Sequence, residues 1–169
     1  MGRVFEDHAV GMILKHAPGR TITEADNVRS TSMTMNANPV HCDAHYAKQT
    51  EFGRPLVNSC VTLALVTGLS VLDIDHAYAN LGWDEVRLPA PVAVGDTIYA
   101  GTHVLEARAS GSKPQAGILR VQTTGFNPGW QGGDYLHARG HGLPARSSAH
   151  DSCTHPHRVT SRAARKTSR

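Results

Sequence analysis

The most apolar segment of the chain, residues 56–72, limits the possible folds more than any other feature. If the segment is a helix, small and aliphatic residues cover nearly every side of it: Cys60, Val61, Leu63, Ala64, Leu65, Val66, Leu69 and Val71. A helix that is apolar all round is a buried helix. Because no apolar stretch approaches the roughly 18 residues needed to span a bilayer, we predict the central helix of a soluble core and no membrane partner.

The segments after this helix have the residue pattern of β-strands. Residues 78–88, 96–106 and 117–126 are rich in β-forming residues with rough alternation, and Pro89 and Gly95 punctuate the first pair. A chain of 169 residues has room for one domain with a real core. One long helix followed by antiparallel strands predicts an α+β domain with a curved sheet wrapped around that helix.

Two shorter helices are predicted before the apolar segment. Thr23 can cap a helix that runs to about Met35, with acidic residues in its first turn where they suit the helix dipole. The Asn38-Pro39 step then forces extended backbone. Asp43 can cap a second helix over residues 44–50.

The run from Met35 to His41, followed after five residues by Ala47, carries the most distinctive chemistry. Asn36 and His41 lie five residues apart across a rigid bend, a spacing that can hold one water between an amide and an imidazole. Adding water to a double bond needs a base, an acid and a stabiliser of the enolate oxygen. An imidazole can serve as base or acid near neutral pH, whereas an amide can only orient water. The alternatives are a structural histidine and a helix C-cap asparagine.

A metal site is a weaker reading of the same region. His41, Asp43 and His45 alternate, and imidazole and carboxylate are zinc ligands. No further ligand follows at a suitable spacing, and Asp43 is better used as a helix cap. We therefore expect no metal.

The cysteines, Cys42, Cys60 and Cys153, are odd in number and unrelated in spacing. They indicate free thiols in a reducing compartment. Cys42 beside His41 is expected to be a buried thiol and no nucleophile, because adjacent side chains diverge. Residues 1–15 lack a signal-peptide core, so we expect a cytoplasmic protein.

The run from Met35 to His41 resembles the signature of the MaoC-like dehydratases, Gly-Asp-x-Asn-Pro-aliphatic-His followed by five residues and a small one. Asn36 stands where that signature has aspartate, and Met35 where it has glycine. Further matches follow in order over roughly residues 15–127: Phe52–Val57, Val86–Leu88, Pro91–Val92 and Gly95–Thr97. Residues 80–87 are most similar to the mesaconyl-CoA hydratase, or β-methylmalyl-CoA dehydratase, branch. If that branch carries Met-Asn, Asn36 is a trait of the lineage.

The resemblance implies a single hot-dog domain that forms a homodimer and binds a CoA thioester in a tunnel near the dimer interface. It implies syn addition of water to an enoyl-CoA, with no metal or organic cofactor. By position, His41 matches the acid/base histidine, Asn36 takes the place of the water-holding aspartate, and Asn38 matches the asparagine that shapes the loop. Backbone amides at the start of the central helix polarise the thioester carbonyl in this family, and Gly53 lies at a loop that could supply one.

Further substrate contacts are expected near the start of the central helix. Asn58 and Ser59 replace a His-Gly pair of many relatives, and the serine hydroxyl could contact a polar group of the acyl chain. It could equally bond the preceding helical turn. Arg54 and Lys113 are candidates for the CoA phosphates, or ordinary surface charges.

The chain departs from its resemblance after residue 127. Glycines interrupt every candidate element: Gly129, Gly132, Gly133, Gly140 and Gly142. We therefore predict that residues 1–127 form the hot-dog domain without its last strand, and that residues 128–169 are an aberrant, disordered tail. Residues 1–137 hold ten Lys or Arg and thirteen Asp or Glu, a net −3, while residues 138–169 hold seven Lys or Arg and one Asp, a net +6.

A frameshift near Asn127 would explain this change. A back-translation of residues 128–145 that loses one nucleotide encodes QDGKVVITYTRAVMVYRR, an Asp-Gly turn followed by an alternating strand. An intact reading frame in independently resequenced DNA would contradict the hypothesis. The basic tail could bind nucleic acid, but a solvated extension without a nucleic-acid partner is the favoured reading.

The sequence thus predicts reversible hydration of an enoyl-CoA, with a mesaconyl-CoA-like compound as a possible substrate. A non-catalytic acyl-CoA-binding or dimer-partner subunit is the first alternative, since Asn36 cannot take a proton. An acyl-CoA thioesterase, which shares the fold, is the second.

Overall fold

The computed structural model describes residues 3–71, 79–113, 115–127 and, for the backbone, 134–146. In chain order its elements are a short 3-10 helix η1 (Phe5–Asp7), β1 (Ile13–Thr21), α1 (Glu24–Met33), α2 (Pro39–Cys42), α3 (Ala44–Lys48), α4 (Ser59–Val71), β2 (Gly82–Arg87), β3 (Thr97–Ala109), β4 (Ala116–Phe126) and β5 (Asp134–Arg146). None of the described helices is long and apolar enough to cross a membrane.

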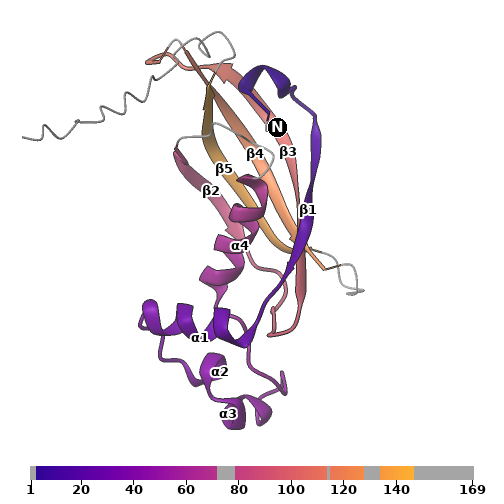
Figure 1. The fold of residues 1–169 in the computed structure, drawn as a ribbon, viewed down its shortest axis with the longest axis vertical. Helices are drawn as coiled ribbons and strands as arrows, with labels where there is room; N and C mark the ends of the chain where they lie inside the picture. The colour runs from indigo at the N-terminus through magenta and orange to yellow at the C-terminus, as the bar shows by residue number, and fades with distance from the viewer. Residues whose placement is uncertain (1–2, 72–78, 114, 128–133, 147–169) are drawn as a thin grey trace, which may run out of the picture.

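One antiparallel sheet with the strand order β1-β3-β4-β5-β2 forms the body of the domain. Figure 1 shows α4 lying across one face of this sheet and α1, α2 and α3 gathered together at one end. The end of β1 at Thr21 pairs with the start of β3 at Thr97, so the three small helices follow that end of the sheet. The predicted α+β architecture of an antiparallel sheet and a central helix is confirmed.

The main core lies between α4 and the sheet. Its buried residues are Ile22, Val57, Val66, Leu69, Val92, Ile98 and Ala100. At Gly125 of β4, an added Cβ would lie 2.5 Å from Cγ2 of Val66. Glycine is therefore required there, because it lets α4 pack this close to the strand.

The sequence predicted that α4 is buried on every side. In the structure, one side of the helix is exposed. Thr62, Val66, Leu69 and Ser70 are buried, but Cys60, Ala64, Gly68 and Val71 are exposed. The exposed residues recur at intervals of three or four and therefore share one side of the helix. The prediction failed because small apolar residues fit a covered and an uncovered helix face equally well.

The sheet contains two strands that the sequence did not predict. Strand β1 contains Pro18 and Gly19, and it lies at an edge of the sheet, where proline is tolerated. Strand β5 pairs with β4 on one side and with β2 on the other, so the prediction that the last strand is missing is wrong for residues 134–146. The rest of the predicted tail, residues 128–133 and 147–169, lies outside the described residues.

Strand β2 is attached to the sheet by side chains as well as by β5. Arg120 of β4 donates to Glu106 of β3 at 2.7 Å and to Asp84 of β2 at 3.0 Å. These hydrogen bonds, first that to Glu106 and then that to Asp84, raise the pKa of Arg120. The guanidinium therefore links three strands, reaching β2 from a strand that is not its neighbour in the sheet.

Candidate functional site

The predicted acid/base residue lies on a very short helix whose ends are fixed by local bonds. Met35, with φ +55°, takes the left-handed conformation just after α1 and turns the chain. Asn38 is extended, and its Oδ1 accepts the amide of Val40 at 3.2 Å as the N-cap of α2, whose first residue is Pro39. The expected extended Asn38-Pro39 step is confirmed, and it places His41 on the single turn that follows.

A backbone carbonyl fixes the orientation of the His41 ring. Nδ1 of His41 lies 3.0 Å from the carbonyl oxygen of Leu56. A carbonyl can only accept a hydrogen bond, so Nδ1 carries the proton and, in the neutral ring, Nε2 carries the lone pair. His41 is half-buried. The arrangement gives the ring one defined nitrogen for proton transfer.

Asn36 takes part in a local turn. Its Oδ1 accepts the backbone amide of Asn38 at 3.3 Å, two residues on, and its own amide donates to the carbonyl of Thr31 at 3.0 Å. Its Nδ2 donates to no other residue within the described part of the chain. The side chain thus shapes the entry to α2 and keeps an amide donor for a further partner.

Asn27, which the sequence analysis did not single out, bonds three separate backbone groups of the region. It lies on α1 and is 1% exposed. Nδ2 donates to the carbonyl of His41 at 2.7 Å and to that of Leu56 at 2.9 Å, while Oδ1 accepts the amide of Asn58 at 3.0 Å. The only signal in the sequence was an asparagine inside a helix, where its propensity is poor.

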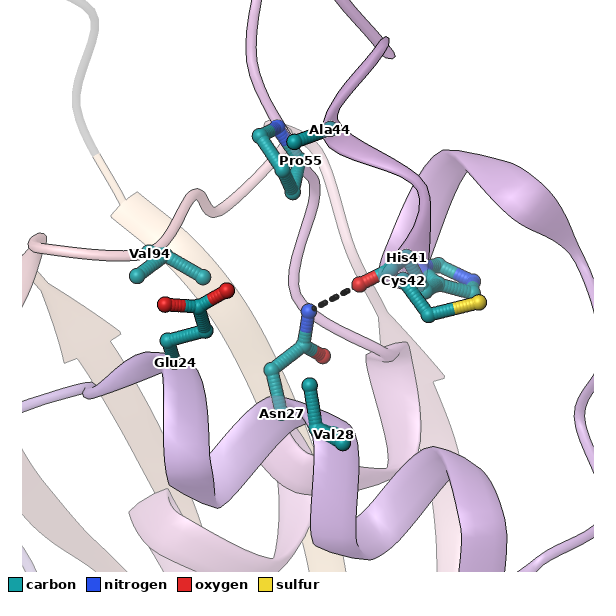
Figure 2. Close-up of a pocket in the computed structure, with 8 residues that line it drawn as sticks. All are labelled: Glu24, Asn27, Val28, His41, Cys42, Ala44, Pro55 and Val94. Atoms are coloured by element: carbon teal, nitrogen blue, oxygen red, sulfur yellow. Dashed lines mark hydrogen bonds between the residues drawn. The ribbon is translucent and has the colours of Figure 1, made fainter. Parts of the chain in front are cut away.

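A cavity of about 280 Å³ lies behind the His41 helix. Its lining residues are Glu24, Asn27, Val28, His41, Cys42, Ala44, Pro55 and Val94. Figure 2 shows the carbonyl of His41 facing Asn27, while the imidazole and the Cys42 sulfur point away from Asn27. Neither Asn36 nor Ser59 is among the lining residues. We infer that this cavity backs the His41 helix and does not itself bring the predicted catalytic groups together.

The start of α4 uses Asn58 as a cap. Oδ1 of Asn58 accepts the amide of Cys60 at 3.0 Å, and Nδ2 lies 3.4 Å from Oγ1 of Thr34. Asn58 is 3% exposed, so these bonds, with that to Asn27, make it a structural residue in this arrangement. Ser59 is exposed, and within the described residues neither its amide nor its hydroxyl has a hydrogen-bond partner. Its amide is therefore available to a substrate oxygen.

The structure places Gly53, Arg54 and Lys113 in three different settings. The amide of Gly53 donates to the carbonyl of Thr50 at 3.1 Å and so is not free to polarise a substrate. Arg54 is exposed and pairs with Asp96 at 3.4 Å. Lys113 lies in the turn after β3, at the opposite end of the sheet from α2, about 40 Å along the strand. One subunit does not bring Lys113 near His41.

The remaining predictions for this region concern the metal-site alternative and the cysteines. Asp43 caps α3 as predicted, with Oδ1 accepting the amide of Tyr46 at 2.9 Å. His45 lies 2.9 Å from Gln49, and no group of metal-binding residues occurs among the described residues.

The prediction that Cys42 is buried is wrong, because Cys42 and Cys60 are both exposed. Cys42 ends the one-turn helix α2, which is too short to cover its side chain. Cys153 lies outside the described residues.

Large apolar side chains are exposed in the chain segments that precede and follow the His41 helix. Met33 is 81% exposed and Met35 88%, and Tyr46 and Phe52 are also exposed. Scattered exposed apolar residues are ordinary, but a group beside a candidate site indicates a surface that binds something.

Comparison with known proteins identifies the relatives of this chain. The family model for the MaoC like domain matches residues 6–125. The β-methylmalyl-CoA dehydratase of Chloroflexus aurantiacus is 31% identical over 71% of this chain and 34% of that protein. The mesaconyl-CoA hydratase of Haloarcula marismortui is 31% identical over 73% of this chain and 35% of that protein. This chain thus spans about a third of the length of these two relatives.

A shorter relative and a solved structure extend the comparison. The (R)-specific enoyl-CoA hydratase of Rhodospirillum rubrum is 27% identical over 71% of this chain and 78% of that protein. A Mycobacterium tuberculosis protein with a double hotdog fold superposes with a TM-score of 0.77, at 24% identity, over 87% of this chain and 45% of that one. The predicted hot-dog fold is confirmed.

Proposed function

Because this chain belongs to the MaoC-like dehydratase family, we propose that it catalyses the reversible addition of water to the double bond of an enoyl-CoA thioester. The observation that carries the proposal is the His41 ring, whose Nδ1 is held as a donor by the Leu56 carbonyl at 3.0 Å. Relatives named mesaconyl-CoA hydratase and β-methylmalyl-CoA dehydratase support a mesaconyl-CoA-like substrate.

His41 carries both proton transfers in this mechanism. Nε2 removes a proton from water as the water oxygen bonds to the β-carbon of the enoyl group. The π electrons of the double bond move toward the thioester carbonyl and form an enolate. The imidazolium then returns the proton to the α-carbon, which gives the 3-hydroxyacyl thioester. One nitrogen acts as base and then as acid, and dehydration follows the same steps in reverse.

Asn36 and Ser59 supply the remaining polar groups. Nδ2 of Asn36 donates to the water oxygen and leaves the water's protons for His41, while Oδ1 stays bonded to the Asn38 amide. The amide of Ser59, at the start of α4, donates to the enolate oxygen. A helix start favours negative charge, so this position suits the developing oxyanion. Ser59 thereby takes the role that the sequence suggested for the Gly53 loop.

The substrate is held by a surface that a second subunit completes. The exposed apolar side chains of Met33, Met35 and Phe52 belong to the segments that flank the His41 helix in the chain, and a homodimer would cover them. Arg54, next to this surface, keeps guanidinium nitrogens that can reach a CoA phosphate while it pairs with Asp96. Lys113 could contribute only from another part of a dimer.

The test follows the loss of enoyl-thioester absorbance with crotonyl-CoA and mesaconyl-CoA. We expect turnover by the wild type, a loss of at least about 100-fold in His41→Ala, and near wild-type rates in His45→Ala. His45 is the matched control, because it is an exposed histidine on the adjacent helix α3. Equal activity of His41→Ala and wild type would contradict the mechanism. Release of free CoA thiol would show a thioesterase instead.

A non-catalytic acyl-CoA-binding subunit is the second candidate, and the Asn36 turn favours it. Since Oδ1 of Asn36 is bonded to Asn38, the residue has a structural use that needs no chemistry. This candidate predicts a folded protein that binds acyl-CoA, shown by a ligand-dependent rise in melting temperature, without any turnover.

A further inference from the structure

We propose that Asn27 is a positioning residue, which holds the acid/base histidine, the carbonyl that orients its ring and the start of α4 in one arrangement. The proposal rests on the hydratase function proposed above. It concerns a residue outside the family motif, on a different helix. Asn27 contacts the backbone of these segments and is not expected to touch the reacting atoms.

The carboxamide of Asn27 makes two hydrogen bonds as a donor and one as an acceptor. The two Nδ2 bonds, to the carbonyls of His41 and Leu56, are 2.7 and 2.9 Å long. The Oδ1 bond from the amide of Asn58 is 3.0 Å long. The partners are 14, 29 and 31 residues away in the chain, and Figure 2 shows the side chain reaching from α1 toward His41. One side chain therefore joins three segments of the domain: α1, α2 and residues 56–58 before α4.

The Leu56 carbonyl connects Asn27 to the His41 ring. It accepts one hydrogen bond from Nδ2 of Asn27 at 2.9 Å and another from Nδ1 of His41 at 3.0 Å. A carbonyl oxygen has two lone pairs, so the two donors together fill it. With Asn27 fixed by burial on α1, one lone pair of Leu56 is left for the ring. Asn27 thus determines where the ring must lie to keep Nδ1 bonded and Nε2 free.

The same side chain determines where the oxyanion donor lies relative to His41. The amide of Asn58, which Asn27 binds, precedes the amide of Ser59 by one residue. A shift of about 1 Å between catalytic groups can lower a rate by about 100-fold. No common side chain other than asparagine supplies two donors and an acceptor in so short a reach: aspartate lacks the donors, and leucine lacks all three.

The test compares two Asn27 variants with a matched control on the same helix. Asn27→Asp keeps the size and the acceptor for Asn58 but loses the donors to His41 and Leu56, and Asn27→Ala loses all three bonds. The control is Thr31→Val, because Thr31 is buried one turn further along α1 and its Oγ1 bonds only the carbonyl of Asn27 at 2.7 Å. Each variant is assayed for kcat and KM, melting temperature and the ¹⁵N shifts of the His41 ring.

We expect both Asn27 variants to lose about 100-fold in kcat, with KM within about threefold of the wild type. The ¹⁵N spectrum should show His41 as the Nδ1–H form in the wild type and in Thr31→Val, and as a mixture of tautomers in the Asn27 variants. Rates and ring signals unchanged in a folded Asn27 variant would overturn the proposal. Equal loss of kcat in Thr31→Val would also overturn it.

Two other outcomes are equally decisive. If both Asn27 variants fail to fold while Thr31→Val folds, Asn27 holds the fold as a whole and the proposal is wrong. If the wild type turns over no enoyl-CoA, the hydratase function fails. The ring signals then still show whether Asn27 sets the orientation of His41.

Discussion

Asn36 stands where the family signature carries an aspartate, and the structure gives its two amide atoms different uses. Oδ1 accepts the Asn38 amide at 3.3 Å, which holds the turn before α2. An aspartate could make the same bond, so the turn does not require the amide. What distinguishes Asn36 from aspartate is that it donates through Nδ2 and takes no proton. In the mechanism proposed above, Nδ2 holds the water as a donor, a task that a carboxylate can perform as an acceptor.

Substitutions at Asn36 should separate these uses. We expect Asn36→Leu, which neither donates nor accepts, to lower kcat by about 100-fold, since oriented donors in active sites have effects of this size. Asn36→Asp should stay within about tenfold of the wild type, because it keeps the turn and can hold the water as an acceptor. Steady-state kinetics with crotonyl-CoA measure both, and circular dichroism checks the fold. A wild type without turnover that gains it as Asn36→Asp would instead indicate a binding subunit.

Sequence reasoning found the residues that are recognisable by type and spacing, and missed those defined by contacts. His41 and Asn38 could be identified because an imidazole after an Asn-Pro step is a rare local pattern. Asn27 could not, because its three partners lie 14 to 31 residues away. Cys42 was predicted to be buried from its residue type alone, and it is exposed because a one-turn helix covers little.

Local signals predicted α1 and α3, because their caps are bonds between near neighbours, whereas the one-turn helix α2 was not predicted. Thr23 caps α1 and forms a capping box with Asp26, and Asp43 caps α3. The strands β2, β3 and β4 were also located, with ends that differ by a few residues. Strand β1 was missed because Pro18 and Gly19 read as a loop, and only its edge position in the sheet makes them acceptable.

The α1 cap makes a pH-dependent prediction. Hydrogen bonds from the Thr23 hydroxyl and amide, and then from Arg20, lower the pKa of Asp26 from 3.8 to about 2. The folded state therefore favours the ionised carboxylate. The contribution of this carboxylate to the free energy of unfolding is fully present above about pH 4 and is lost as the pH falls through about 2. Because Asp26 is partly exposed, we expect Asp26→Asn to lower the free energy of unfolding by only about 1 kcal/mol at pH 7.

Urea unfolding at several pH values measures this difference. The gap between wild type and Asp26→Asn should shrink between about pH 4 and pH 2. The control is Glu51→Gln, an exposed carboxyl outside any helix, which should change stability by less than about 0.5 kcal/mol. A gap that stays constant down to pH 2 would contradict the role of the Asp26 charge.

At the scale of the whole molecule, the sheet is completed by a strand with an unfavourable composition. Strand β5 contains Gly140, Gly142 and Pro144, yet it lies between β4 and β2. Pro144 pairs with Ile118 of β4 but lies beyond His141, the last residue of β5 that pairs with β2. The N–H that proline lacks could therefore have bonded only to β4. The composition predicts no strand here. The strand forms because it supplies hydrogen-bond partners to the otherwise unpaired edges of β4 and β2.

The frameshift hypothesis predicts that the peptide encoded by the alternative reading frame forms a more stable strand at the position of β5. Replacing residues 128–145 with QDGKVVITYTRAVMVYRR puts valine at positions 140 and 142 and arginine at 144. Each glycine replaced in a strand is worth up to about 1 kcal/mol, so we expect a rise of about 2 kcal/mol in the free energy of unfolding. Urea unfolding measures it, and a shuffled peptide of the same composition is the control. A less stable replacement protein would contradict the hypothesis.

The strand order has a consequence for the synthesis of the protein. Among the described strands, β2 pairs only with β5, and Gly82 of β2 pairs with His141. A ribosome adding about 5–20 residues per second needs several seconds to make the residues between these partners. During that interval β2 can have no strand neighbour, and Leu81, Trp83, Val86 and Leu88 are apolar residues of the waiting segment. Nascent chains of this protein should therefore depend on chaperones until the fifth strand emerges.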